Sequence, residues 1–236
     1  MEINLIKKPK NPTILEGFPG FGLIGTITTE YLIDHLKTEL IGTIWIPEMP
    51  ALAAIHENKL IQPIGLFYSK EHNIVIVHVI TSATGFEWKL CKAVRDVAEM
   101  LQAKEILSLE GVGSAMPVEN PAVFYFTTEK NREKDFKKLK ISPLGEGIIM
   151  GVTASILLRE DKLPVSALFV EAQSNLPDSK AAAKIIETLD KLFGLDVDPK
   201  PLLEQAEKFE GKIKNLLDQA KFATQEQKKK MLSYVG

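Results

Sequence analysis

The segment Glu16-Gly17-Phe18-Pro19-Gly20-Phe21-Gly22-Leu23-Ile24-Gly25 separates two apolar stretches of different period. The stretch before it, residues 13–16, is short and apolar, as in a buried strand. After it, apolar residues recur in steps of three and four, which is typical of one face of a helix; they are Ile24, Ile27, Tyr31, Leu32 and Leu36. The segment therefore predicts a strand, a tight glycine-rich loop and a helix.

The rest of the chain continues this alternation. Apolar stretches predict strands at 40–46, 60–68, 73–81, 105–110, 122–127 and 163–171, and helices at 86–101, 129–140, 148–158 and 179–193. The stretch 73–81 is almost continuously apolar, as in a strand that is buried on both faces. Pro63 predicts that strand 60–68 lies at an edge or starts irregularly. We expect an α/β core domain of residues 1–200, a three-layer sandwich around a mostly buried sheet.

The pattern changes after Pro199 and Pro201. Apolar residues then alternate in steps of four and three, which predicts an amphipathic C-terminal helix over residues 201–223. This helix needs a groove, and its own domain is the favoured place over another subunit. Residues 224–236 are predicted to be a flexible tail, in which lysines precede a small apolar cluster. The tail has two open alternatives: it docks on its own core, or it fills a pocket of another protein.

Composition narrows the possible functions. The chain has 236 residues, 45% of them hydrophobic, and a formal net charge of −2. We expect no nucleic-acid or membrane partner, because either would favour a basic surplus. The N-terminus lacks the apolar core of a signal peptide, and no stretch approaches the ~20 apolar residues of a membrane span, so the protein is expected to be soluble and cytoplasmic.

The sequence favours neither a metal site nor a catalytic thiol. Cys91 is the single cysteine, which excludes a disulfide within the chain and a cysteine-rich metal site; we expect a buried structural thiol. The four histidines are scattered without zinc-site spacing. We expect no metal and no cofactor.

The glycine-rich loop can be interpreted in two ways. Gly20, Gly22 and Gly25 match the G-x-G-x-x-G spacing of dinucleotide-binding loops, which hold phosphate at a helix N-terminus. However, Pro19 and the neighbouring phenylalanines make this loop bulky, and the acidic residue expected ~20 residues further on has no clear counterpart. We therefore expect a structural turn or subunit contact, made by Gly17, Pro19, Gly20, Gly22 and Gly25. The alternative is a nucleotide-binding or phosphorylase-like enzyme that uses loop 17–25 and a nearby glutamate.

Four glutamates stand near predicted strand ends, at Glu16, Glu48, Glu110 and Glu171. Acidic residues at such positions can converge on a cleft of an α/β sheet. The sequence leaves open whether these four meet.

Several segments together resemble one family. Residues 16–25 are similar to its G-F-P-G-x-G-x-x-G opening, and residues 145–151 to a later glycine-rich segment. Glu171-Ala172, followed by Leu176-Pro177-Asp178 and Ala181-Ala182, resembles its E-A…P-D-x-x-A-A signature, and residues 193–198 resemble the approach to its C-terminal helix. In this order they resemble the proteasome-assembly chaperone family, which contains the second eukaryotic assembly chaperone and its archaeal relatives. Ser155 departs from the glycine of many relatives.

The resemblance implies a phosphorylase-like fold without phosphorylase chemistry, so no enzyme. It implies ATP-independent binding to proteasome α subunits and a homo-oligomer, with a second family member as another possible partner. Some relatives insert a hydrophobic-tyrosine-any residue tail between α subunits, where the ring fills a slot and the terminal carboxylate pairs with a lysine. Here Tyr234 is third from the end and follows Ser233. The partner-binding residues implied in this shifted register are Leu232, Tyr234, Val235 and Gly236.

Overall fold

The computed structural model describes residues 1–56, 58–113, 119–159, 162–172 and 177–204, together with 206, 208, 210, 211, 213–215 and 218. Within these residues a nine-stranded sheet has the order β1-β3-β6-β7-β2-β8-β11-β9-β10, and β4 and β5 pair separately as a hairpin. The strands are β1 (Glu2–Leu5), β2 (Thr13–Gly17), β3 (Glu39–Trp45), β4 (Ala54–His56), β5 (Lys59–Ile61), β6 (Ile64–Ser69), β7 (Ile74–Val79), β8 (Glu105–Gly113), β9 (Val123–Thr127), β10 (Ser142–Pro143) and β11 (Val165–Ala172).

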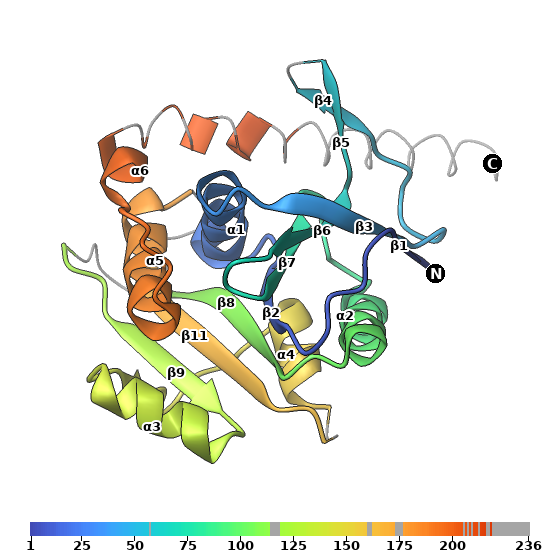
Figure 1. Ribbon diagram of the computed structural model, residues 1–236. Helices are drawn as coiled ribbons and strands as arrows, with labels where there is room; N and C mark the ends of the chain where they lie inside the picture. Colours follow the sequence, from blue (N-terminus) through green and yellow to red (C-terminus); the bar gives the residue numbers. More distant parts are fainter. Residues whose placement is uncertain are drawn as a thin grey trace, which may run out of the picture.

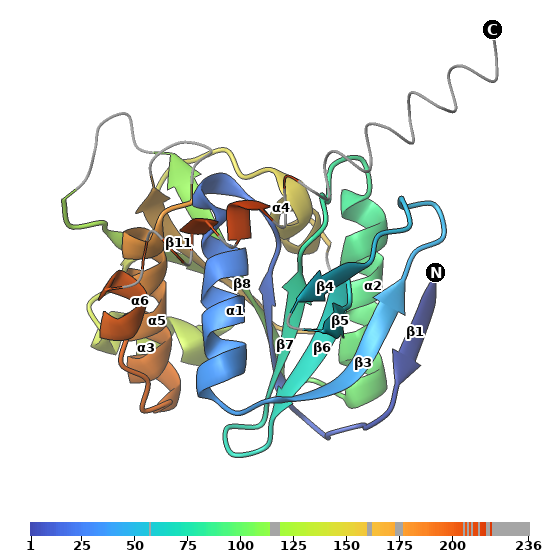
Figure 2. The same cartoon turned by 90° about the horizontal axis from the view of Figure 1, so that it is seen from above.

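Helices cover both faces of the sheet (Figures 1 and 2). The cores on the two faces show that α1, α3 and α5 pack on one face and α2 and α4 on the other. The helices are α1 (Ile24–His35), α2 (Glu87–Leu101), α3 (Lys130–Lys138), α4 (Gly151–Leu157), α5 (Ser179–Phe193) and α6 (Lys200–Glu204). The predicted three-layer α/β fold is confirmed, while its likeness to phosphorylases stays a prediction.

The centre of the sheet is parallel and buried. β7, β2, β8 and β11 run side by side in the same direction. In β7, Ile74 and Ile76 pack toward α1 and α5, whereas Val75, Val77 and Val79 pack toward α2 and α4. Alternate residues of a strand point to opposite faces, so a strand covered on both sides must be apolar throughout. This is why 73–81 carries such a strong strand pattern.

α5 shows how local signals set the helix ends. The Asp178 side chain accepts a hydrogen bond from the Ala181 amide at 2.9 Å, and Gly194 ends the helix with φ 64°. An acidic N-cap satisfies a free amide at the helix start, and glycine adopts the left-handed conformation that ends a helix at little cost. The helix starts and ends where its periodicity predicts.

The strand predicted at 60–68 is divided by Pro63. Its first part is β5, in the hairpin, and its second part is β6. β6 lies between β3 and β7, so the expectation of an edge strand is wrong and that of an irregular start is confirmed. Pro63 precedes β6, where its missing N–H removes no ladder bond, and its carbonyl accepts from the Ile80 amide at 3.1 Å. Strand β1, which no pattern predicted, extends the sheet beside β3.

The described part of the C-terminal helix packs on its own domain. Leu202 and Ile213 are buried in the core formed with α1 and α5, and the Glu210 carboxylate accepts a hydrogen bond from the Ser179 amide at 2.9 Å. These contacts fit docking on the same chain. The predicted boundary between the core domain and the C-terminal helix, at residue 200, stays a prediction. Residues 219–236, with the predicted tail and Leu232, Tyr234, Val235 and Gly236, lie outside the described residues.

Cys91 is a buried free thiol, as predicted, and its Sγ donates to the Ser155 carbonyl at 3.3 Å. Over the described ranges, no helix combines the length and the apolar character needed to cross a membrane.

Candidate functional site

The glycine-rich loop joins β2 to α1 through a turn of 3-10 helix, η1 (Phe21–Leu23). Gly17 ends β2, Gly25 lies in the first turn of α1, and their backbones touch. A Cβ on Gly17 would lie 2.2 Å from the Gly25 carbonyl oxygen, and a Cβ on Gly25 would lie 2.7 Å from the Leu109 carbonyl oxygen. No side chain fits at these distances, so the two glycines allow α1 to start directly against β2 and β8.

Gly20 and Gly22 attach the loop to its other neighbours. A Cβ on Gly20 would lie 2.2 Å from Glu110 Oε1, and the Phe21 amide donates to the same oxygen at 3.3 Å. Gly22 has φ 63°, a conformation that favours glycine, and its carbonyl accepts from the Asp178 amide at 3.0 Å. These contacts describe a structural turn between β8 and α5. A role in subunit contact stays a prediction.

The loop forms one wall of a cavity of ≈ 990 Å³ at the carboxyl edge of the parallel strands. Ligands of open α/β sheets bind at this edge. β8 and β11 contribute to the cavity, as do the segment 82–87 after β7 and the segment 144–152 that leads into α4. Pro19 lines it together with Phe18, Gly20 and Phe21.

The cavity is acidic. Its lining contains the carboxylates of Glu87, Glu110, Glu146 and Glu171, and among the lining residues that the structure describes there is no lysine, arginine or histidine. Low-dielectric walls around charges of one sign concentrate their field. The cavity therefore favours cationic groups and repels anions.

The four glutamates near strand ends divide into two groups. Glu110 and Glu171 line the cavity, and Glu16 lies on the strand next to Glu110. Glu48 is elsewhere, on the surface, with its Oε1 2.7 Å from Lys89 Nζ, and this hydrogen bond lowers its pKa. Glu87 and Glu146 belong to loops and helix starts, so strand-end reasoning missed them. Their signal was a nearby glycine, because Glu146 lies between Gly145 and Gly147 and Gly85 is two residues before Glu87.

Glu16, which is fully buried, and Glu110, which is partly exposed at the cavity, form an adjacent carboxyl pair. Glu16 pairs in register with Ser108, two residues before Glu110, so both carboxyl groups point to the α2–α4 face. Glu110 accepts from the Gly111 amide and from Thr153 Oγ1, each at 3.2 Å. Burial raises the pKa of Glu110 to about 7 against these hydrogen bonds.

Glu16 is the more perturbed member of the pair. It is fully buried, and its oxygens make no hydrogen bond of normal geometry within the described part of the chain. Burial raises its pKa to about 8, the Ser108 hydroxyl opposes part of the rise, and the charge of Glu110 adds to it. Because burial disfavours the charged form of Glu16 and the neighbouring charge of Glu110 adds to this, the pair holds a proton at neutral pH.

This geometry disfavours phosphate binding. A dinucleotide-binding loop presents free amides to the pyrophosphate. Here the Phe21 amide donates to Glu110 instead, and the nearby carboxylates repel an anion. The G-x-G-x-x-G spacing is explained by close packing at Gly20, Gly22 and Gly25.

The rim of the cavity is apolar and exposed. Ile148 and Met150 line the cavity and are 92% and 78% exposed. Sequence reasoning assigned 148–158 to one helix, which would have buried part of this segment. The helix instead begins at Gly151, so Ile148 and Met150 lie before it. Exposed apolar side chains beside a cavity are typical of a binding surface.

The remaining candidate residues make structural contacts. His78 lies in β7, with Nδ1 2.8 Å from Thr29 Oγ1 and Nε2 3.0 Å from Glu30 Oε2, which fits a satisfied core histidine. Within the described ranges, no group of three or more His, Cys, Asp or Glu side chains is arranged to hold a metal ion.

Comparison with known proteins decides the family. Residues 14–217 match the PAC2 family over most of the chain. This protein belongs to the PAC2 family. The predicted resemblance to the proteasome-assembly chaperone family is thereby confirmed.

Solved structures of this family share the fold. PbaA from Pyrococcus furiosus, described as an archaeal homologue of proteasome-assembly chaperone, is 26% identical and superposes with a TM-score of 0.84 over 94% of this chain and 99% of that chain. PbaB from the same organism, described as an archaeal proteasome activator, is 22% identical and has a TM-score of 0.73 over 91% of this chain and 98% of that chain. An uncharacterised protein of Methanocaldococcus jannaschii is 24% identical over 212 residues, which are 89% of this chain and 87% of that protein.

Proposed function

We propose that this PAC2 family protein is a cytoplasmic, non-enzymatic proteasome-assembly chaperone that binds proteasome α subunits without ATP. The observation that carries the proposal is the likeness to PbaA over nearly the whole length of both chains. The acidic cavity supports the ATP-independent part, because its carboxylates and the Glu110–Phe21 hydrogen bond disfavour a triphosphate. The alternative of a nucleotide-dependent enzyme has no comparable support.

A projecting hairpin supports assembly into a homo-oligomer. Ile55 of β4 and Leu60 of β5 are directly paired and are 76% and 61% exposed. Figure 1 shows this hairpin extending away from the sheet. Two large apolar side chains held side by side in water are stabilised when another surface covers them. We assign Ile55 and Leu60 to the contact between copies, and the C-terminal residues Leu232, Tyr234, Val235 and Gly236 to the α subunits.

The chaperone proposal is tested by mixing the protein with proteasome α subunits of the same organism on a sizing column with mass detection. We expect a stable complex at micromolar concentration. Separate elution would overturn the binding of α subunits, and a second PAC2 family member would be tested next.

The role of the tail is tested separately with a chain that ends at Lys230. We expect this truncation to abolish the complex, Tyr234→Ala to weaken it, and the neighbouring Ser233→Ala to leave it intact. If the truncated chain still binds, the tail assignment fails while the chaperone proposal stands.

The hairpin is tested by the oligomer mass. The double variant Ile55→Asp/Leu60→Asp should lower the mass to that of a smaller species. Ile6→Asp is the matched control, because Ile6 is also exposed but lies on the segment after β1. An unchanged mass in the double variant would exclude the hairpin as the contact.

A further inference from the structure

The cavity at the carboxyl edge has two chemical features that together define an occupant. Its walls carry Glu87, Glu146 and Glu171 without a compensating cation among the described lining residues, and its rim exposes Ile148 and Met150. An occupant that satisfies both features must carry several positive charges close to apolar side chains. A single small cation would leave the rim uncovered.

The chain itself contains a segment of this composition. Residues 228–236 read Lys-Lys-Lys-Met-Leu-Ser-Tyr-Val-Gly, three lysines followed directly by apolar and aromatic side chains. Lysines can reach the carboxylates while their neighbours cover the apolar rim, because a lysine stem is long and flexible. The segment is therefore complementary to the cavity in charge and in apolar character.

The described part of the C-terminal helix already lies at the same edge of the sheet. Glu210 accepts from the Ser179 amide at the start of α5, and α5 follows the carboxyl end of β11, whose Glu171 lines the cavity. Figure 2 shows α4 and the described residues after α6 near this same edge. The chain thus reaches the carboxyl edge of the sheet before its end, on the α1–α5 face, whereas α4 lies on the other face (Figure 1).

The length of chain beyond the last described residue is sufficient. Residues 219–227 separate Asp218 from the first lysine, and such a spacer reaches up to about 30 Å when extended. The strands β7, β2, β8 and β11, whose ends border the cavity, together span only about 15 Å at ~4.8 Å per strand. The spacer is thus about twice as long as the row of strand ends that borders the cavity.

We propose that the acidic cavity is the docking site for residues 228–236 of the same chain. Lys228, Lys229 and Lys230 bind the wall formed by Glu87, Glu146 and Glu171, and the residues after them cover the apolar rim. A docked tail withholds Tyr234 from other proteins, a consequence that rests on the proposed role of the tail. The docking itself needs no proteasome subunit, so the protein alone tests it.

The test is carbodiimide cross-linking of the full-length protein, followed by protease digestion and mass spectrometry. Carbodiimide joins a lysine amine to a carboxylate in contact with it. We expect cross-links from residues 228–230 to Glu87, Glu146 or Glu171, and their loss at ~1 M salt, where the screening length falls to about 3 Å. Equal amounts of unlabelled and ¹⁵N-labelled protein distinguish links within one copy from links between copies.

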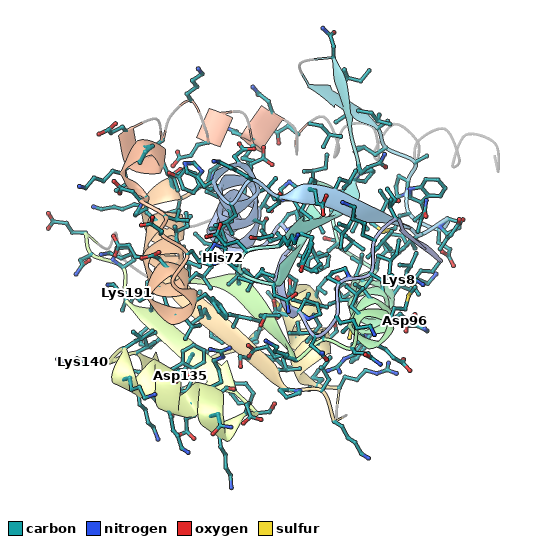
Figure 3. All side chains as sticks on the ribbon, in the orientation of Figure 1. Lys8, His72, Asp96, Asp135, Lys140 and Lys191 are labelled. Carbon is teal, nitrogen blue, oxygen red and sulfur yellow. The ribbon has the colours of Figure 1, made fainter. Side chains whose placement is uncertain are left out.

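Two charge reversals make the test specific. Glu146→Lys, an exposed change at the cavity, should lower the yield of these cross-links about fivefold. Glu71→Lys is the matched control, because Glu71 is also exposed but lies in the turn between β6 and β7, next to His72, which Figure 3 labels. This turn is at the amino edge of the parallel strands, opposite to the cavity, so the control should leave the yield unchanged.

Three outcomes would overturn the proposal. The cross-links could be absent, they could persist unchanged in Glu146→Lys, or they could join labelled to unlabelled copies. The last outcome would assign the cavity to the tail of a second copy. None of them bears on whether the protein binds α subunits, so failure here and failure of the proposed function are distinguishable.

Discussion

Two glycine-rich segments border the same cavity, and their glycines serve different purposes. In loop 17–25 a Cβ on Gly17 or Gly20 would lie 2.2 Å from another atom. In segment 145–151 a Cβ on Gly145 or Gly151 would have nothing within 4 Å. The first segment is glycine-rich because other elements approach its backbone, whereas the second is open to solvent and carries exposed apolar side chains. A glycine count cannot separate these cases, because only the surrounding atoms differ.

Adding one methyl group to each segment should separate them most strongly. Gly17→Ala places its Cβ against the Gly25 backbone, so we expect the free energy of unfolding to fall by about 3 kcal/mol or more. Gly145→Ala enters open space and should change it by less than about 0.5 kcal/mol. Urea denaturation of both variants measures the difference. Equal losses would contradict the assignment of loop 17–25 as a packed turn.

The carboxyl pair beneath the first segment should make stability depend on pH. The pKa of Glu16 is raised from 4.5 to about 8 in the native state, so between these values the native protein holds a proton that the unfolded chain has released. The free energy of unfolding therefore falls as pH rises from about 5 to about 8, by a few kcal/mol. Glu110, raised to about 7, contributes in the same direction.

Glu16→Gln removes one titrating group and keeps its shape. The variant should be more stable than the wild type at about pH 9 and should show a shallower fall with pH. Glu146→Gln in the exposed segment serves as the control and should keep the wild-type slope. Urea titrations at several pH values measure all three proteins. A wild-type slope in Glu16→Gln would show that the pair does not control this dependence.

Alanine substitutions at Gly22 and Gly151 should separate the energetic cost of backbone conformation from that of a steric collision. Gly22 and Gly151 both have positive φ, 63° and 80°. Alanine should cost about 1 kcal/mol at Gly151 from conformation alone. At Gly22 its Cβ would also lie 2.9 Å from the Ala172 Cβ, so the cost should reach about 2 kcal/mol. If thermal denaturation gives the two variants the same loss, the Gly22–Ala172 contact has relaxed.

The smallest expected effect is that of nucleotides on the stability of the wild-type protein. Saturation at ~100 times the dissociation constant would stabilise a binding protein by about 2.7 kcal/mol. Because the carboxylates of the cavity repel phosphate, we expect no shift in melting temperature with ATP, NAD, nucleosides or inorganic phosphate. A shift with any of them would favour the enzyme alternative and would show that loop 17–25 can open toward a ligand.

Much of the architecture could be predicted from local patterns. α5 begins and ends where its periodicity and its capping residues Asp178 and Gly194 place it, and β7 has the continuous apolar run of a doubly covered strand. The position of β6 could not be predicted, because Pro63 marks an irregular start equally well in the middle of a sheet and at its edge. The pairing of β1 with β3 depends on a partner some 40 residues away, which no local pattern contains.

The sequence by itself determined the order of most of the strands and helices, the glycine loop between β2 and α1, and the resemblance to the PAC2 family. These are local properties, set by periodicity, capping residues and short motifs. Only the tertiary structure decided that Glu110 and Glu171 share an acidic cavity with Glu146, while Glu48 lies elsewhere. The order of strands in the sheet brings Glu110 and Glu171 together, and burial raises the pKa of Glu110. Both depend on contacts between residues that are far apart in the chain.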